Sequence, residues 1–208
     1  MTSCGKSIKG KLSNDWKVES PTLKAIDTES KGNQTVTTTS YSGTTVTVKE
    51  EEIENGNSTT TTTQIGTITN PIFKIENNGT WNFSRTLVFT QNPTQGLTTT
   101  ITSVETDSGT WSFIGKNKEE DFKKNERVLF NTMATTRNTT TVNTIGNSST
   151  TSTDTGSSTY KLGDNVTIYT VVASKPKALE LKSESGGSTT SGTSTESFTT
   201  ESTIKLVQ

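Results

Sequence analysis

The chain has 208 residues, a formal net charge of −1 and a pI near 5.7. With 20 basic against 21 acidic residues it presents no positive field for a phosphate backbone, which argues against nucleic acid as a partner. No apolar run approaches the roughly eighteen residues that a membrane-spanning helix needs. The length is that of one β-sandwich or barrel, so a single domain is expected.

The apolar content is unusually low for a folded domain. Hydrophobic residues make up 25% of the chain, whereas threonine accounts for 48 of the 208 residues. A β-branched threonine fits the water-facing side of a pleated strand and is a poor helix former. A strand with threonine outward needs only half of its positions to be apolar. The composition therefore predicts an all-β, antiparallel domain over residues 12–208, preceded by a tether at residues 1–11.

The start of the chain contains its only cysteine, Cys4, so no internal disulfide can form. The stretch Met1-Thr2-Ser3-Cys4-Gly5-Lys6-Ser7 resembles the end of a bacterial lipobox. That resemblance implies acyl chains on Cys4 and attachment to a membrane. The alternative is an incidental cysteine near a terminus. In Bacteroidota lipoproteins acidic residues after the cysteine mark export to the cell surface. Lys6 and Lys9 stand there instead, which implies an outer-membrane lipoprotein facing the periplasm.

Alternating segments then predict about 8–10 strands in an up-and-down meander. A first strand carries Trp16, and three pairs of segments read as hairpins around Ser42-Gly43, Asn77-Asn78-Gly79 and Asp107-Ser108-Gly109. Arg137–Ser158 and Glu184–Thr195 lack apolar anchors and are predicted to be polar loops. Lys116–Glu126 is a dense charge cluster, expected to form a helical turn or a loop. The predicted strands after the first are 34–41, 44–49, 59–69, 72–76, 80–90, 97–106, 110–115, 127–135, 166–174, 178–183 and 197–207.

Two near-identical segments supply the best candidates for inward-facing residues. Asn78-Gly79-Thr80-Trp81-Asn82-Phe83 and Ser108-Gly109-Thr110-Trp111-Ser112-Phe113 each place Trp and Phe two residues apart, hence on one strand face. These side chains either fill a barrel or line a ligand pocket inside it. The candidates for core or pocket are Trp16, Phe73, Trp81, Phe83, Trp111, Phe113 and Tyr169.

An early Trp16, the two Gly-Thr-Trp segments and the later Tyr160-Lys161-Leu162, Leu179-Glu180-Leu181 and Ile204-Lys205-Leu206 together resemble the lipocalin-like lipoproteins of Bacteroidota. The resemblance implies a lipocalin-like barrel or a strongly curled sheet. It departs from lipocalins proper at Asn14-Asp15-Trp16, where they carry Gly-x-Trp, and in two Thr-rich insertions. The short motifs consist of turn and core residues, so they bear on fold more than on activity.

The chain contains no histidine, which removes the usual general base and the commonest transition-metal ligand. The acidic runs Glu50-Glu51-Glu52 and Glu119-Glu120-Asp121 are typical of solvated faces. No metal, nucleotide or other cofactor motif is present, and no catalytic residues are predicted. The sequence thus predicts a non-enzymatic, lipid-anchored envelope protein that binds a small apolar or amphipathic ligand. The alternative is a structural subunit that docks to an envelope protein partner.

Overall fold

A computed structural model describes residues 12–19, 21–29, 32–115, 126–175, 177–191 and 194–208. Every regular element among these residues is a strand, and strands account for 85% of the structure. The strands are β1 (Asn14–Val18), β2 (Thr22–Thr28), β3 (Gln34–Ser42), β4 (Thr45–Glu54), β5 (Asn57–Ile75), β6 (Thr80–Thr94), β7 (Leu97–Gly115), β8 (Glu126–Ile145), β9 (Ser148–Thr159), β10 (Val166–Lys175), β11 (Ala178–Ser191) and β12 (Ser194–Val207).

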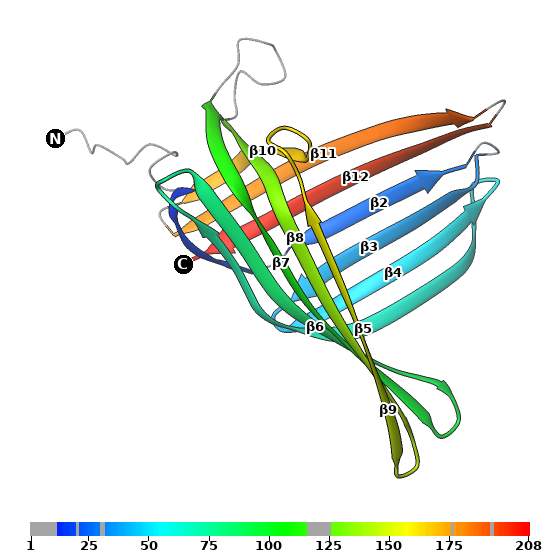
Figure 1. Ribbon diagram of the computed structural model, residues 1–208. Coiled ribbons are helices and arrows are strands. Elements are labelled where there is room, and N and C mark those ends of the chain that lie inside the picture. The colour runs from blue at the N-terminus through cyan, green and yellow to red at the C-terminus, as the bar shows by residue number, and fades with distance from the viewer. Residues whose placement is uncertain (1–11, 20, 30–31, 116–125, 176, 192–193) are drawn as a thin grey trace.

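Ten of the strands close into an antiparallel barrel. The ring runs β12-β11-β10-β8-β7-β6-β5-β4-β3-β2, and β2 pairs back onto β12. Outside this ring, β9 pairs with β8, and β1 pairs with both β5 and β12. Figure 1 shows the resulting curved wall of strands. The prediction of an all-β, antiparallel, lipocalin-like barrel is confirmed.

The barrel changes its circumference along its axis, and β1 is the cause. At one end β1 joins β12 at residues 206–207 to β5 at residues 72–75, so the ring there has β1 in place of β2, β3 and β4. Further along, β12 pairs with β2 and β5 pairs with β4. The described ring therefore widens from eight strands to ten. A bulge between Thr69 and Ile72, with Asn70 at a φ of +52°, marks the point where β5 changes partner.

The narrow end holds the main core. An eight-stranded barrel is just wide enough for its own side chains to fill. Trp16 is 1% exposed there and donates its indole N–H to the Leu12 carbonyl at 2.8 Å. Leu12 is also fully enclosed, and the strands β5, β8, β11 and β12 contribute four more fully enclosed residues: Ile75, Val128, Leu181 and Leu206. This end of the barrel is plugged by side chains.

At the wide end the wall separates into two sheets. The first part of β5, residues 57–65, pairs with β4 alone, and residues 183–191 of β11 pair with β12 alone. Strands β6 to β9 continue as a separate sheet, and within the described part of the chain β9 pairs with β8 alone. Figure 1 shows the β6–β7 and β8–β9 hairpins leaving in a different direction from β2 to β4.

Two of the predicted hairpin turns are present, whereas a third hairpin and two predicted loops are not. The turns around Gly43 and Gly79 are present, with φ of +59° and +87°. The prediction of a hairpin at Asp107-Ser108-Gly109 was wrong. Strand β7 runs without a turn through these residues, and its register against β8 shifts between Ser108 and Gly109, where β8 has the extra residue. The polar loops expected at 137–158 and 184–195 were also wrong: the described parts form the β8–β9 and β11–β12 hairpins, whose backbone pairing needs no apolar anchor. The unpredicted strand β2 completes the ring.

Two expected features lie outside the described residues: the tether at residues 1–11 with Cys4, and most of the charge cluster 116–126. Within the part of the chain that is described, no helix is long and apolar enough to cross a bilayer.

Candidate functional site

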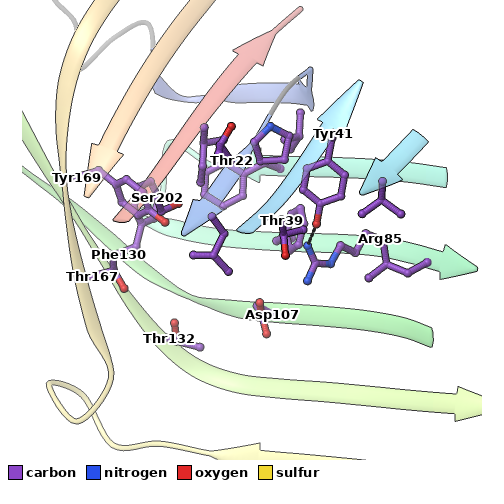
Figure 2. Close-up of a pocket in the computed structure, with 18 of the residues that line it drawn as sticks. Thr22, Thr39, Tyr41, Arg85, Asp107, Phe130, Thr132, Thr167, Tyr169 and Ser202 are labelled. Carbon is purple, nitrogen blue, oxygen red and sulfur yellow. Dashed lines mark hydrogen bonds between the residues drawn. The ribbon is translucent and has the colours of Figure 1, made fainter. Parts of the chain in front are cut away.

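A cavity of about 490 Å³ lies in the wide part of the barrel, next to the plugged end. Its volume falls within the roughly 300–1,000 Å³ typical of small-molecule sites. The cavity exists because the ring has gained strands here, while the inward side chains of β2, β3 and β12 are mostly small or medium in size. Figure 2 shows Thr22, Thr39 and Ser202 on these walls.

Five aromatic side chains form the end of the cavity nearest the plug, and we call them the aromatic floor: Phe73, Trp81, Phe83, Phe130 and Tyr169. Their rings pack edge to face or tilted, as quadrupolar rings prefer. The Trp81 and Phe130 ring centroids are 5.6 Å apart, and those of Phe130 and Tyr169 are 5.7 Å apart. The floor offers an apolar surface to a guest.

The opposite side of the cavity is both apolar and polar. Val46 and Leu87 belong to a second buried cluster with Tyr41 and Ile68, and both line the cavity. Beside them, Arg85 projects inward from β6. Its position follows from strand alternation, because Trp81, Phe83, Leu87 and Phe89 share its parity on the strand.

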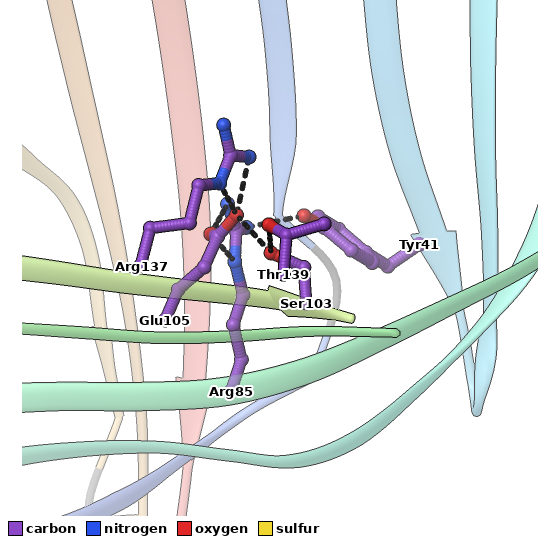
Figure 3. Close-up of polar contacts among 6 residues, drawn as sticks. All are labelled: Tyr41, Arg85, Ser103, Glu105, Arg137 and Thr139. Carbon is purple, nitrogen blue, oxygen red and sulfur yellow. Dashed lines mark hydrogen bonds and ion pairs between the residues drawn. The ribbon is translucent and has the colours of Figure 1, made fainter. Parts of the chain in front are cut away.

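Arg85 belongs to a charge network that Figure 3 shows. Its Nε donates to Glu105 Oε2 at 2.7 Å, and one of its terminal nitrogens donates to the Tyr41 hydroxyl. Arg137 donates through Nε to the other oxygen of Glu105 at 2.9 Å. The Glu105 side chain is only 13% exposed, whereas that of Arg137 is 65% exposed. One carboxylate thus holds two guanidinium groups.

Burial alone would raise the pKa of Glu105. The charges and hydrogen bonds of Arg85 and Arg137 outweigh burial, so that its pKa lies below the usual value. Burial raises the pKa of the Tyr41 hydroxyl, and the Glu105 charge adds to this while Arg85 opposes it. The network therefore holds Glu105 ionised and Tyr41 neutral at pH 7.

Asp107 is the second carboxylate on the cavity wall, and its situation differs from that of Glu105. It lies in β7 opposite Phe83 of β6, and it points into the cavity in Figure 2. Among the described residues, no hydrogen bond or ion pair reaches this carboxylate. Burial raises its pKa, the charge of Arg85 lowers it, and that of Glu105 raises it, with a net shift upward.

A second hollow of about 370 Å³ adjoins the cavity and is lined by polar residues of β7, β8 and β9. Asp107 and Arg137 line both spaces. Asp107 therefore stands at the junction between an apolar space and a polar one, which is where the head of an amphipathic guest would lie.

The residues predicted as core or pocket divide into two groups. Phe73, Trp81, Phe83 and Tyr169 line the cavity. Trp16 and Trp111 lie in the core at 1% and 8% exposure, and Phe113 packs against that core. These three residues are not part of the cavity lining. The described residues contain no group of three or more acidic, histidine or cysteine side chains that could hold a metal ion.

Sequence reasoning missed Tyr41, Arg85, Glu105, Asp107, Phe130 and Arg137. A usable signal existed for Arg85, which is in phase with four apolar residues of its strand. Asp107 was assigned to a turn because Ser-Gly follows it, and the register shift between β7 and β8 after Asp107 could not be seen in the sequence.

No known protein family matches this chain, nor does any curated protein or solved structure. The barrel and its cavity are the features that bear on function.

Proposed function

We propose that the chain is a non-catalytic binding protein that holds one small amphipathic molecule inside its barrel. The observation that carries this proposal is the cavity of about 490 Å³ between the aromatic floor and the Arg85–Glu105 network. Apolar rings at one end and polar groups at the other match a molecule with an apolar body and a polar head. Burial of the apolar body against the floor would contribute roughly 25 cal/mol per Å² removed from water.

Two matched substitutions in β3 test the proposal. Thr39 faces the cavity, and Thr38 is its neighbour on the opposite strand face. A tryptophan at position 39 would occupy the cavity, whereas one at position 38 would point outward. We expect the fluorescence of N-phenyl-1-naphthylamine to rise with wild-type protein and with Thr38→Trp, and to stay at its value in buffer with Thr39→Trp.

Undiminished dye binding by a folded Thr39→Trp variant would contradict the proposal. A second measurement does not depend on any variant. Native mass spectrometry of protein purified from its own host should show added mass from a retained small molecule, which heat or solvent extraction removes.

We also propose that acyl chains on Cys4 attach the barrel to the outer membrane, on its periplasmic side. The support is the resemblance of Met1–Ser7 to a processed lipobox, together with Lys6 and Lys9 after the cysteine. Mass spectrometry of membrane-extracted protein tests this proposal. An unmodified Cys4, or a Cys4→Ser variant that still fractionates with membranes, would contradict it.

Docking to an envelope partner is the second candidate function, and one observation favours it. Among the described strands, β9 pairs along residues 148–159 with β8 on one side only, which leaves its other edge with backbone groups that an added strand could pair with. Substitution of Thr153 by proline would block such an edge. Loss of a co-purifying protein on Thr153→Pro, with dye binding unchanged, would support docking through the β9 edge as a function separate from the cavity.

A further inference from the structure

Asp107 is a carboxylate on the cavity wall that makes no hydrogen bond or ion pair with the described residues. By contrast, each guanidinium nitrogen of Arg85 is engaged: Nε and one terminal nitrogen with Glu105, the other terminal nitrogen with Tyr41. Glu105 is in turn shared by Arg85 and Arg137. A ligand in the cavity therefore meets Arg85 and Glu105 with their hydrogen bonds already formed. Next to them it meets the Asp107 carboxylate, which makes no such bond with the described residues.

The surroundings of Asp107 make that carboxylate costly to keep ionised. It is half-buried, and an unpaired charge in such a position is unfavourable unless it gains a partner. An ionised carboxylate only accepts hydrogen bonds, so the partner must be a donor. A positively charged donor gives the larger gain, because charge-assisted hydrogen bonds are roughly twice as strong as neutral ones.

Aromatic rings stand close to the same carboxylate. Phe83 is the register partner of Asp107 on the adjacent strand. The charge of Asp107 also contributes to raising the pKa of the Tyr169 hydroxyl, although burial is the main cause and hydrogen bonds with Ser202 and Ser183 oppose the shift. The Arg85 guanidinium already lies 5.6 Å from the Phe83 ring centroid, an arrangement in which a ring face attracts a cation.

From this arrangement we infer that the barrel ligand is an amine whose protonated nitrogen pairs with Asp107, while its alkyl or arylalkyl part lies on the aromatic floor. The inference rests on the proposed function, since it names the chemical class of the ligand in that same cavity. A carboxylate head is disfavoured there, because it would face Asp107 as a like charge and would find the Arg85 nitrogens occupied.

The charges near the site do not oppose an ammonium group. Arg85 is neutralised by Glu105 within hydrogen-bond distance. Arg137 shares that carboxylate, and with a side chain 65% exposed its remaining charge is largely screened by water. Asp107 is thus the carboxylate that a head group in the cavity meets without an ion-pair partner among the described residues, although the charge of Arg85 acts on it from a distance.

Three ligands of equal chain length separate the head-group contribution from the apolar one: decylamine, decanol and decanoate. Each is titrated calorimetrically, below its critical micelle concentration, into wild-type protein, Asp107→Asn and the control Asp27→Asn. Asp27 is an exposed aspartate on β2, away from the cavity lining. The control removes the same charge from the chain and leaves the site unchanged.

We expect wild-type protein and Asp27→Asn to bind decylamine about tenfold or more tightly than decanol, the difference that a charge-assisted hydrogen bond supplies. In Asp107→Asn this preference should be lost while decanol still binds. In the wild type, decylamine affinity should also fall as the pH is lowered through the pKa of Asp107, and decanol affinity should not.

Tighter binding of decanoate than of decylamine would overturn the inference, as would an unchanged amine preference in Asp107→Asn. Either result would leave the proposed function standing, because a guest still occupies the cavity. Failure of all three ligands to bind wild-type protein would instead contradict the proposed function itself. Circular dichroism confirms that Asp107→Asn is folded before its affinities are compared.

Discussion

Gly109 of β7 lies against the backbone of Asn131 in β8, so closely that a β-carbon at position 109 would be 1.9 Å from the Asn131 carbonyl oxygen. The same oxygen accepts the indole N–H of Trp81. This contact lies at the bulge where β7 shifts its register against β8, and it holds the aromatic floor against the barrel wall.

Gly109→Ala should therefore destabilise the protein by about 1–3 kcal/mol, the usual range for forcing an extra group into a packed site. Gly156→Ala is the matched control, because its β-carbon would meet nothing within 4 Å. Urea unfolding of both variants provides the comparison. Equal stabilities would mean that β7 and β8 do not approach each other in this way.

Trp111→Ala should cost about 3–5 kcal/mol, the range for removing a buried aromatic side chain. Trp111 is 8% exposed, and its indole N–H donates to the Glu76 carbonyl at 2.8 Å, which ties β7 to the end of β5. Phe198→Ala should cost far less, since Phe198 is 48% exposed. A loss below about 1 kcal/mol for Trp111→Ala would place this residue on the surface.

Lowering the pH should weaken the charge network, because it protonates the Glu105 carboxylate. Its pKa is lower in the folded protein than the usual 4.5, so its contribution to stability is complete above that value and is lost as the pH falls through the folded pKa. Glu105→Gln removes this contribution and leaves Arg85 and Arg137 as adjacent positive charges. We expect a loss of about 2 kcal/mol at pH 7 that shrinks in acid. A difference from wild type that stays constant from pH 7 to pH 3 would disagree with this account.

The ionised carboxylate of Asp107 should lower stability, whereas that of Glu105 raises it. The pKa of Asp107 is raised above 3.8 in the folded protein, so the folded state binds its proton more tightly than the unfolded state does. The ionised form is thus a cost that is complete above the folded pKa and disappears as the pH falls below 3.8. We expect Asp107→Asn to be as stable as wild type or more so at pH 7, with the two converging in acid. A less stable variant at pH 7 would point to a structural partner for this carboxylate.

Local sequence patterns account for much of the barrel. Alternation around Trp81 and Phe83 placed both residues on the inner face, and the turn residues near Gly43 and Gly79 placed two hairpins. These features depend on neighbouring residues in the chain, so a single sequence reveals them. Four of the five residues of the aromatic floor were among the predicted candidates, and Phe130 was missed.

The remaining features depend on how whole strands pair, which the local sequence pattern does not encode. All residues of β9 are exposed, so no inward apolar side chain marks it as a strand, and its position is set by backbone pairing with β8. The widening of the ring depends on β1 replacing three strands at one end, which no local pattern encodes. The polar half of the site, with Asp107, was missed because its position depends on the bulge that follows it.

Occupation of the cavity by a guest is the central claim, and it is tested most directly by nuclear Overhauser effects between decanol and the protein. We predict effects between the alkyl protons of decanol and the ring protons of Phe83, Phe130 and Tyr169, which line the cavity. Effects confined to Val166 and Ile168, which are exposed residues of β10, would place the alcohol on the surface of the barrel and contradict the claim.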